Sequence, residues 1–232
     1  MAVTRTGGII EIDSSGNSGS QSVTVPADAE IMVVSVGGYL ASGGSDYLSG
    51  TPPTIGGAAM TLGRDDDPDG TMLIQCIFYK VSPATGAQTF AWDWTGTATA
   101  TLGMQMNIAF YTGIDTASAI GANGGDQDAD SSATTGSMVV ANGDAVFVGA
   151  VAYNTTVPAI DFTNATELVD NTALGIRSGC AEAFPTGDTT FTATHNGGSG
   201  ATPATTISAL VIKQAAGGGA SITRQMMAHE GA

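Results

Sequence analysis

Apolar and polar residues alternate along most of this chain, in short runs separated by turn residues. IIEI at 9–12 and QTFAWDW at 88–94 alternate strictly, whereas EIMVVSVGGY at 30–39 and TMLIQCIFYKV at 71–81 are almost continuously apolar. The alternation predicts strands with one buried face, and the continuous runs predict strands covered on both faces. A long helical stripe of apolar residues at i, i+3 and i+4 is missing from the interior of the chain. Further strands are predicted at 22–25, 104–113, 144–153, 175–184, 189–195 and 205–213.

The order of these predicted elements repeats. VPADAEIMVVSVGGY (25–39) resembles VANGDAVFVGAVAY (140–153), and QCIFYKVSPATGAQTFAWDW (75–94) resembles GCAEAFPTGDTTFTATH (179–195). The repeat places Cys76 opposite Cys180 and Phe90 opposite Phe191. Roughly a dozen strands with short turns between them indicate an antiparallel sandwich or barrel.

We therefore expect an all-β fold: an antiparallel, jelly-roll-like β-sandwich over 23–213, built from two similar halves. The first half spans about 23–113 and the second about 138–213, with a polar, glycine-rich junction at 114–137. Strands such as IMVVSV need cover on both faces, which favours one sandwich closed by both halves. Two abutting sandwiches are the alternative.

Both ends lie outside the repeat. Residues 1–22 are expected to form an N-terminal arm with a first strand. Residues 214–232 contain a glycine hinge followed by Ile222, Met226 and Met227. So short a segment is marginal as an isolated helix, and termini fray unless they are held. We expect a C-terminal arm that docks on a neighbouring subunit, or alternatively a tail folded on its own domain.

The chain is strongly acidic, with 6 basic and 21 acidic residues and a net charge of −15. Such a surface repels nucleic acid and anionic membranes, so neither is an expected partner. No apolar run approaches the roughly 18 residues that span a bilayer. The start MAVTRTGG has no apolar core of a signal peptide, which predicts synthesis and assembly in the cytoplasm.

Two acidic runs invite a metal interpretation. Asp65, Asp67 and Asp69 alternate before Gly70, as at the start of a calcium loop. However, Cys76 stands where the loop needs a bidentate glutamate, so we expect a solvated turn and no metal site. A second run contains Asp126, Asp128 and Asp130 and lacks both the glycine and the glutamate of such a loop. Whether the aspartates at 65–69 bind calcium stays open at this point.

Catalytic signatures are weak, and we expect no enzyme, no catalytic residue and no cofactor. His195 and His229 are the only histidines, and no G-x-S-x-G elbow accompanies them. Paired carboxylates of a glycoside hydrolase can come from distant strands. Among the few glutamates, Glu182 lies in a strand with alanine neighbours and could face a cavity.

The aromatic residues and cysteines also have plain structural interpretations. Phe90, Trp92 and Trp94 share one strand face, which can stack on sugars but is more typical of a sandwich core. Cys76 and Cys180 are expected as buried apolar fillers, with a disulfide between them as an alternative.

Two pairs of segments carry a resemblance to a known family. TPPTIGGAAMT (51–61) with IFYKVSPATGAQTFAWDW (77–94), and NATELVD (164–170) with FPTGDTTFTAT (184–194), resemble β-rich structural proteins of tailed bacteriophage virions. The resemblance covers about 23–213. It implies a β-sandwich and location in the virion, and no catalytic residues. The segments outside 23–213 inherit nothing from it.

Within a virion two roles compete. A capsid decoration or cement protein would form homo-oligomers, with trimers favoured, and clamp major capsid protein subunits from outside. A tail or fibre component would bind the host surface through the tryptophan face or through residues 40–50. The acidic body and short adhesive ends favour decoration. A third class, a carbohydrate-binding or glycoside-hydrolase module, would need an export signal that MAVTRTGG does not provide.

Overall fold

The structure, a computed structural model, describes residues 2–40, 51–66, 73–94, 101–128, 132–153, 160–173, 175–196 and 205–216. In these ranges the chain forms β-strands, turns and bends, and no helix. None of the described residues belongs to a helix able to cross a membrane. The prediction of an all-β antiparallel fold is confirmed. The predicted arm at 214–232 lies mostly outside the described residues.

The first half contains two sheets. The first central sheet has the order β1 (Thr4–Ser14), β9 (Thr101–Thr112), β3 (Ile31–Leu40), β7 (Leu73–Val81), β6 (Thr61–Asp65). The first cover sheet has the order β2 (Ser18–Val25), β8 (Gly86–Asp93), β4 (Thr54–Ile55), β5 (Ala58–Ala59). Successive strands alternate between the two sheets at the start and at the end of this half. This crossing over is the jelly-roll topology.

The second half repeats the arrangement. The second central sheet has the order β10 (Ile120–Asp128), β19 (Thr205–Ile212), β13 (Ala145–Tyr153), β16 (Ile176–Ala183), β15 (Thr166–Ala173). Its cover consists of the pair β12 (Met138–Val140) and β17 (Thr189–Phe191), and of the trio β11 (Ser132–Thr134), β18 (Thr194–Asn196), β14 (Asp161–Thr163). Each strand of the second central sheet occupies the place of its counterpart in the first.

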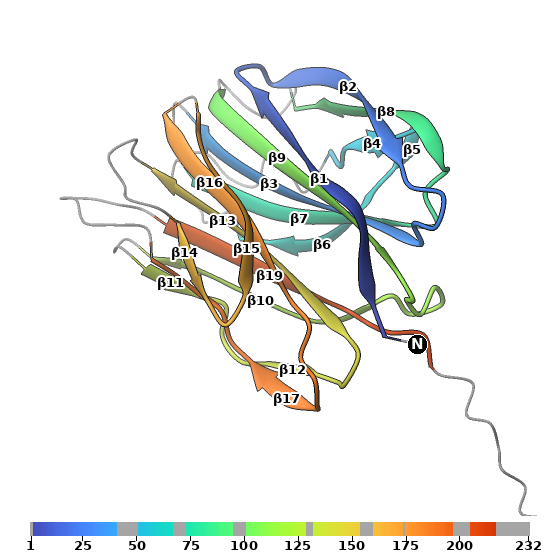
Figure 1. The fold of residues 1–232 in the computed structure, drawn as a ribbon. Coiled ribbons are helices and arrows are strands. Elements are labelled where there is room, and N and C mark those ends of the chain that lie inside the picture. Colours follow the sequence, from blue (N-terminus) through green and yellow to red (C-terminus); the bar gives the residue numbers. More distant parts are fainter. Residues whose placement is uncertain are drawn as a thin grey trace, which may run out of the picture.

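The sheets pack in four layers (Figure 1), and apolar side chains fill the three spaces between them. Met32, Val34 and Phe78 face the first cover sheet, where they meet Phe90 and Trp94. The opposite faces of the two central sheets pack on each other, and there Ile31 and Val33 share a cluster with Phe147 and Leu210. Val146 and Val148 face the second cover together with Phe191. Burial on both faces explains why the central strands read as continuous apolar runs.

The sequence analysis favoured one sandwich closed by both halves, and the structure corrects this preference. Each half is a sandwich of its own, and the two halves share the middle core. The sequence predicted the cover strands β2 and β8 and the segment of β17 and β18, but it missed β4, β5 and β14, which are only two or three residues long. Strands of that length leave no measurable alternation in the sequence.

Two segments placed outside the repeat belong inside it. The first strand expected within residues 1–22 is present: residues 4–14 pair with β9 from Thr4↔Thr112 to Ser14↔Met104, with one register shift, so this strand belongs to the central sheet. The junction at 114–137 contains β10, which pairs with β19 in the equivalent position. The repeated unit therefore begins at β1 and at β10.

The sequence repeat was also matched one residue out of register on one strand. Val33 pairs with Tyr79 in the first half, and the equivalent Phe147 pairs with Glu182 in the second. Cys180 therefore matches Ile77 and not Cys76. A slip of one residue turns a side chain to the other face of a sheet. Cys76 accordingly faces the first cover sheet while Cys180 lies in the middle core, and no disulfide joins them.

Candidate functional site

Glu182, the carboxylate that the sequence analysis singled out, joins the two halves. It lies in β16 with a side chain 8% exposed. Arg5 Nε of β1 donates a hydrogen bond to its Oε1 at 3.0 Å. The Tyr111 hydroxyl of β9 donates to its Oε2 at 3.1 Å. Both carboxylate oxygens of a second-half strand are therefore held by first-half side chains.

The environment of this cluster keeps the Tyr111 hydroxyl protonated. Burial raises the pKa of the Tyr111 hydroxyl well above its ordinary value, and the negative charge of Glu182 raises it further. The hydroxyl therefore stays protonated and remains a donor. A guanidinium and a phenol that share one carboxylate form a charge-assisted anchor between the halves.

Two pockets flank this anchor, each with a volume of about 580 Å³. Both are lined by Glu182, Phe184 and Pro185. One continues along 189–192 of β17 and its neighbours. The other, called here the N-terminal pocket, continues along residues 2–5 and 142–144. Phe184 stands between the pockets with 42% of its surface exposed, and its ring contacts Tyr111 with centroids 6.5 Å apart. Glu182 thus faces cavities, as its sequence position suggested.

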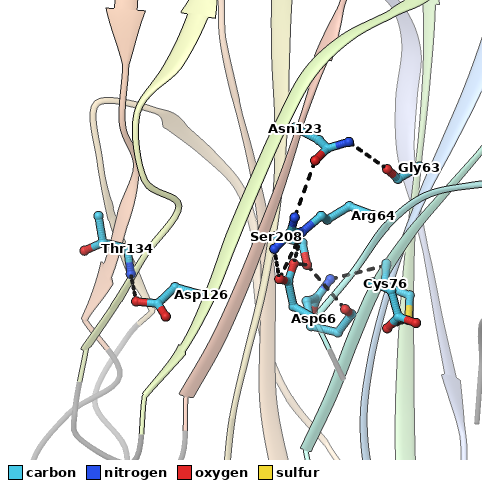
Figure 2. A network of polar contacts seen from close by, with 10 residues as sticks. Gly63, Arg64, Asp66, Cys76, Asn123, Asp126, Thr134 and Ser208 are labelled. Carbon is cyan, nitrogen blue, oxygen red and sulfur yellow. Dashed lines mark hydrogen bonds and ion pairs between the residues drawn. The ribbon is translucent and has the colours of Figure 1, made fainter. Parts of the chain in front are cut away.

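A second polar network connects the halves along the edge where β6 approaches β10 (Figure 2). Arg64 forms an ion pair with Asp66, whose side chain is 6% exposed. The Ser208 hydroxyl of β19 donates to Asp66 Oδ2 at 2.5 Å. Arg64 Nη1 also donates to Asn123 Oδ1 at 3.4 Å, and Asn123 donates to the Gly63 carbonyl. The hydrogen bond to Asp66 raises the pKa of Arg64, which stays charged.

The aspartates proposed for calcium are only partly described. The thiol of Cys76 lies 3.2 Å from Asp65 Oδ1, and Asp126 accepts a hydrogen bond from the Thr134 backbone at 3.4 Å. Asp67, Asp69 and Gly70 lie outside the described residues, as does Asp130, and the side chain of Asp128 is not described. Within the described ranges no three His, Cys, Asp or Glu side chains gather as a metal site would require.

We expect chelation with EDTA to leave the melting temperature nearly unchanged. The sequence at 64–70 lacks the bidentate ligand of a calcium loop, and the mostly buried carboxylate of Asp66 is satisfied by Arg64 and Ser208. Thermal unfolding with EDTA, and again after calcium is restored, measures this. A drop of about ten degrees or more that calcium reverses would assign a structural ion to this loop.

His195 lies in the core of the second half. It is fully buried in β18, its ring packs on Phe162 with centroids 6.0 Å apart, and neither ring nitrogen has a hydrogen-bond partner. Burial lowers the pKa of His195 to about 4. The pairing of Phe90 with Phe191 in the repeat makes His195 the counterpart of buried Trp94. His229 lies outside the described residues.

His195 makes folding stability depend on pH. Its pKa of about 4 in the folded state is below the unfolded value of about 6.5, so the folded state resists the proton that the unfolded chain binds. This contribution is complete above about pH 6.5 and is lost as the pH falls towards 4. Relative to His195→Leu, the wild-type protein is expected to lose about 2 kcal/mol more between pH 7 and pH 5. Urea unfolding of both proteins at the two pH values measures this difference, and parallel losses would contradict it.

The aromatic face proposed as a sugar platform is core. Phe90 and Trp94 are fully buried, Trp92 is nearly so, and Asp93 points outward. Trp94 Nε1 donates to the Thr51 carbonyl at 2.8 Å. The expectation that this face forms a sandwich core is confirmed, and Phe90, Trp92 and Trp94 are not available for stacking on a ligand.

Sequence reasoning missed a buried polar layer between the central sheets. Ser35 of β3 accepts a hydrogen bond from Gln75 Nε2 of β7 at 2.9 Å, and both residues are fully buried. Ser178 and Asn107 face the same interface and keep polar atoms without partners. The sequence does carry a signal: each of these residues interrupts a mainly apolar strand, as Ser35 does in IMVVSVGG and Gln75 in MLIQCIFY. Arg5, Arg64 and Asp66 left no comparable signal.

Comparison of the chain with protein-family models, with curated protein sequences and with solved structures yields no match.

Proposed function

We propose that this chain is a structural protein of a tailed-phage virion and acts as a capsid decoration protein that attaches to other subunits from outside. The observation that carries the proposal is the free edge of β2. This strand, SGSQSVTV, pairs with β8 over all eight residues, and none of the described strands pairs with its other side. An open edge offers a row of backbone donors and acceptors to a neighbouring chain.

The other long edge strands differ from β2. β6 approaches β10, and β1 approaches β15, where Asn171 donates to Glu11 at 3.3 Å. All four also carry charged residues, whereas β2 carries none. Charges on edge strands discourage edge-to-edge pairing. In a chain with a net charge of −15, an uncharged open edge is a favourable place for another acidic subunit to approach.

The layout of the fold agrees with a role in assembly. Jelly rolls occur in viral capsid proteins and in lectins, so this is support by analogy only. The lectin comparison is weakened because Phe90, Trp92 and Trp94 are core residues. The large apolar side chains exposed among the described residues are Val139 and Phe184, at 77% and 42%. Both lie in the second half and add exposed apolar area to which another subunit can bind.

The test is a binding experiment with separated phage heads and tails from the virus that encodes this chain. The purified protein should sediment with heads in a regular copy number and form a repeating density on the shell in electron micrographs. Binding to tails alone would support a tail or fibre role. Binding to neither particle would overturn the virion assignment.

Charged substitutions at the β2 edge test the observation itself. We expect Ser20→Lys with Ser22→Lys to abolish head binding while changing the free energy of unfolding by less than about 0.5 kcal/mol, because both side chains are exposed. Thr89→Lys is the matched control: it adds charge to exposed Thr89 of β8, a strand paired on both sides. Equal binding by the edge variant and the control would show that β2 is not the contact.

A further inference from the structure

We propose that the N-terminal pocket is the docking site of the C-terminal segment 217–232 of the same chain. The pocket's lining includes Val3, Asn142, Asp144, Glu182, Phe184 and Pro185. Its volume of about 580 Å³ lies in the range of roughly 300–1,000 Å³ that is usual for clefts that bury a ligand.

The end of the described chain is fixed at the rim of this pocket. The Gln214 backbone N–H donates to Asp144 Oδ1 at 2.9 Å, and its side-chain amide donates to the Asn142 carbonyl. Ala215 N–H donates to the Gly113 carbonyl at 2.9 Å. Asn142 and Asp144 both line the pocket. The segment that follows Ala216 therefore starts beside the pocket.

The length and composition of the segment suit the pocket. Six residues lead from Ala216 to Ile222, and an extended chain of that length reaches about 20 Å. The large apolar residues of 217–232 are Ile222, Met226 and Met227. Val3, Phe184 and Pro185 provide apolar wall, and methionine side chains adapt to irregular apolar surfaces. Attachment at Gln214 also gives the segment a high effective concentration at its own pocket.

The charges of the segment and of the pocket also favour docking. Segment 217–232 has one basic residue, Arg224, and one acidic residue, Glu230, so it is neutral in a chain whose net charge is −15. In the pocket wall Arg5 balances the charge of Glu182, which leaves Asp144 as the uncompensated carboxylate there, and nearby Asp188 accepts a hydrogen bond from the backbone of Asn142 at 2.8 Å. Arg224 approaching this acidic rim gains favourable electrostatic energy.

Tryptic cleavage after Arg224 tests the proposal, because Arg224 is the single Lys or Arg in 217–232. Protection is measured as the cleavage rate of a free peptide with the sequence 217–232 relative to the cleavage rate of the full chain. Docking is expected to protect the full chain about tenfold or more. Phe184→Ser should speed cleavage about fivefold, while Val139→Ser, which removes the other exposed apolar side chain, should leave the rate within about twofold. Equal rates for the two variants would overturn the proposal.

A second variant changes the segment and leaves the pocket intact. Met226→Ser with Met227→Ser should remove protection without altering the fold, after correction with a peptide carrying the same changes. Protection must also stay constant on hundredfold dilution of the protein, because the contact is within one chain. Protection that falls on dilution would make a second copy the source of the segment and would overturn the proposal as stated.

Disulfide trapping gives an independent readout. Met226→Cys with Thr186→Cys at the exposed pocket rim should form a cross-link within one chain on mild oxidation. Met226→Cys with Ala58→Cys, at an exposed site in the first cover sheet, is the matched control and should remain unlinked within a chain. Native Cys76 and Cys180 are buried and stay out of the reaction. A cross-link with Ala58→Cys equal to that with Thr186→Cys would contradict the docking site.

Discussion

Substitution of Gly149 by serine is expected to destabilise the protein by about 3 kcal/mol or more and to lower its soluble yield. Gly149 lies in β13 where this strand crosses β3 between the central sheets. A Cβ atom there would lie 2.1 Å from Ser35 Oγ and 2.8 Å from Ser35 Cβ. The Cβ of Ser35 is fixed by its backbone, so the two sheets would have to separate. Chemical unfolding in urea measures the loss.

The repeat supplies a compensating change. Ser35 and Gly149 occupy equivalent positions in the two halves, as the alignment of Tyr39 with Tyr153 shows. In the double variant Ser35→Gly with Gly149→Ser the hydroxymethyl group moves to the other strand. The Gln75 amide, whose Nε2 would lie 2.6 Å from the new Cβ, has to shift, and from its new place it can donate to the introduced hydroxyl as it now donates to Ser35. The double variant should recover more than half of the lost stability.

The matched control is Gly187→Ser, at a glycine with open space around its Cβ position and no left-handed backbone. It should change the free energy of unfolding by less than about 0.5 kcal/mol. If the double variant were no more stable than Gly149→Ser alone, the close approach of β3 to β13 would not be the cause of the loss.

Removal of the Glu182 carboxylate is the second change with a large expected effect. Glu182→Ala leaves the buried Tyr111 hydroxyl without its acceptor and Arg5 without its counter-charge. Loss of one partner of a buried charged cluster typically costs about 3–5 kcal/mol, and we expect the lower end because Arg5 remains 30% exposed. Urea unfolding measures the cost, and Tyr111→Phe should cost about 1 kcal/mol in the same assay.

Glu167→Ala is the matched control for this change. Glu167 is an exposed carboxylate on the neighbouring strand β15, and its removal should cost less than about 0.5 kcal/mol. Similar losses for Glu182→Ala and Glu167→Ala would show that the anchor contributes little to holding the halves together.

The sequence predicted those strands and buried faces that the local pattern of apolar and polar side chains determines. The runs at 30–39 and 71–81 became central strands, and the alternation at 88–94 placed Phe90 and Trp92 inside. The strand at 9–12 was recognised, but its place in the central sheet was not. Pairing of β1 with β9 joins residues about a hundred positions apart, and no local pattern encodes that register.

The candidate site shows the same limit. Glu182 could be singled out because a carboxylate in an alanine-rich strand is unusual. Its partners Arg5 and Tyr111 come from two distant strands, so nothing in the sequence near either residue indicates the contact. In the acidic run at 64–70 the alternating positions drew attention, whereas the partly buried ion pair with Arg64 uses the intervening Asp66. Burial, set by β19 across the interface, decided which aspartate matters.

The serine opposite a glycine where β3 crosses β13 has a consequence for how this protein is constructed. A homodimer of half-length chains would place identical residues on both sides of its symmetry axis, either two serines that collide or two glycines that leave a gap. Joining both halves in a single polypeptide lifts that restriction. Each side of the crossing can then carry a different residue, and the axis can be packed more closely than two serines or two glycines would permit.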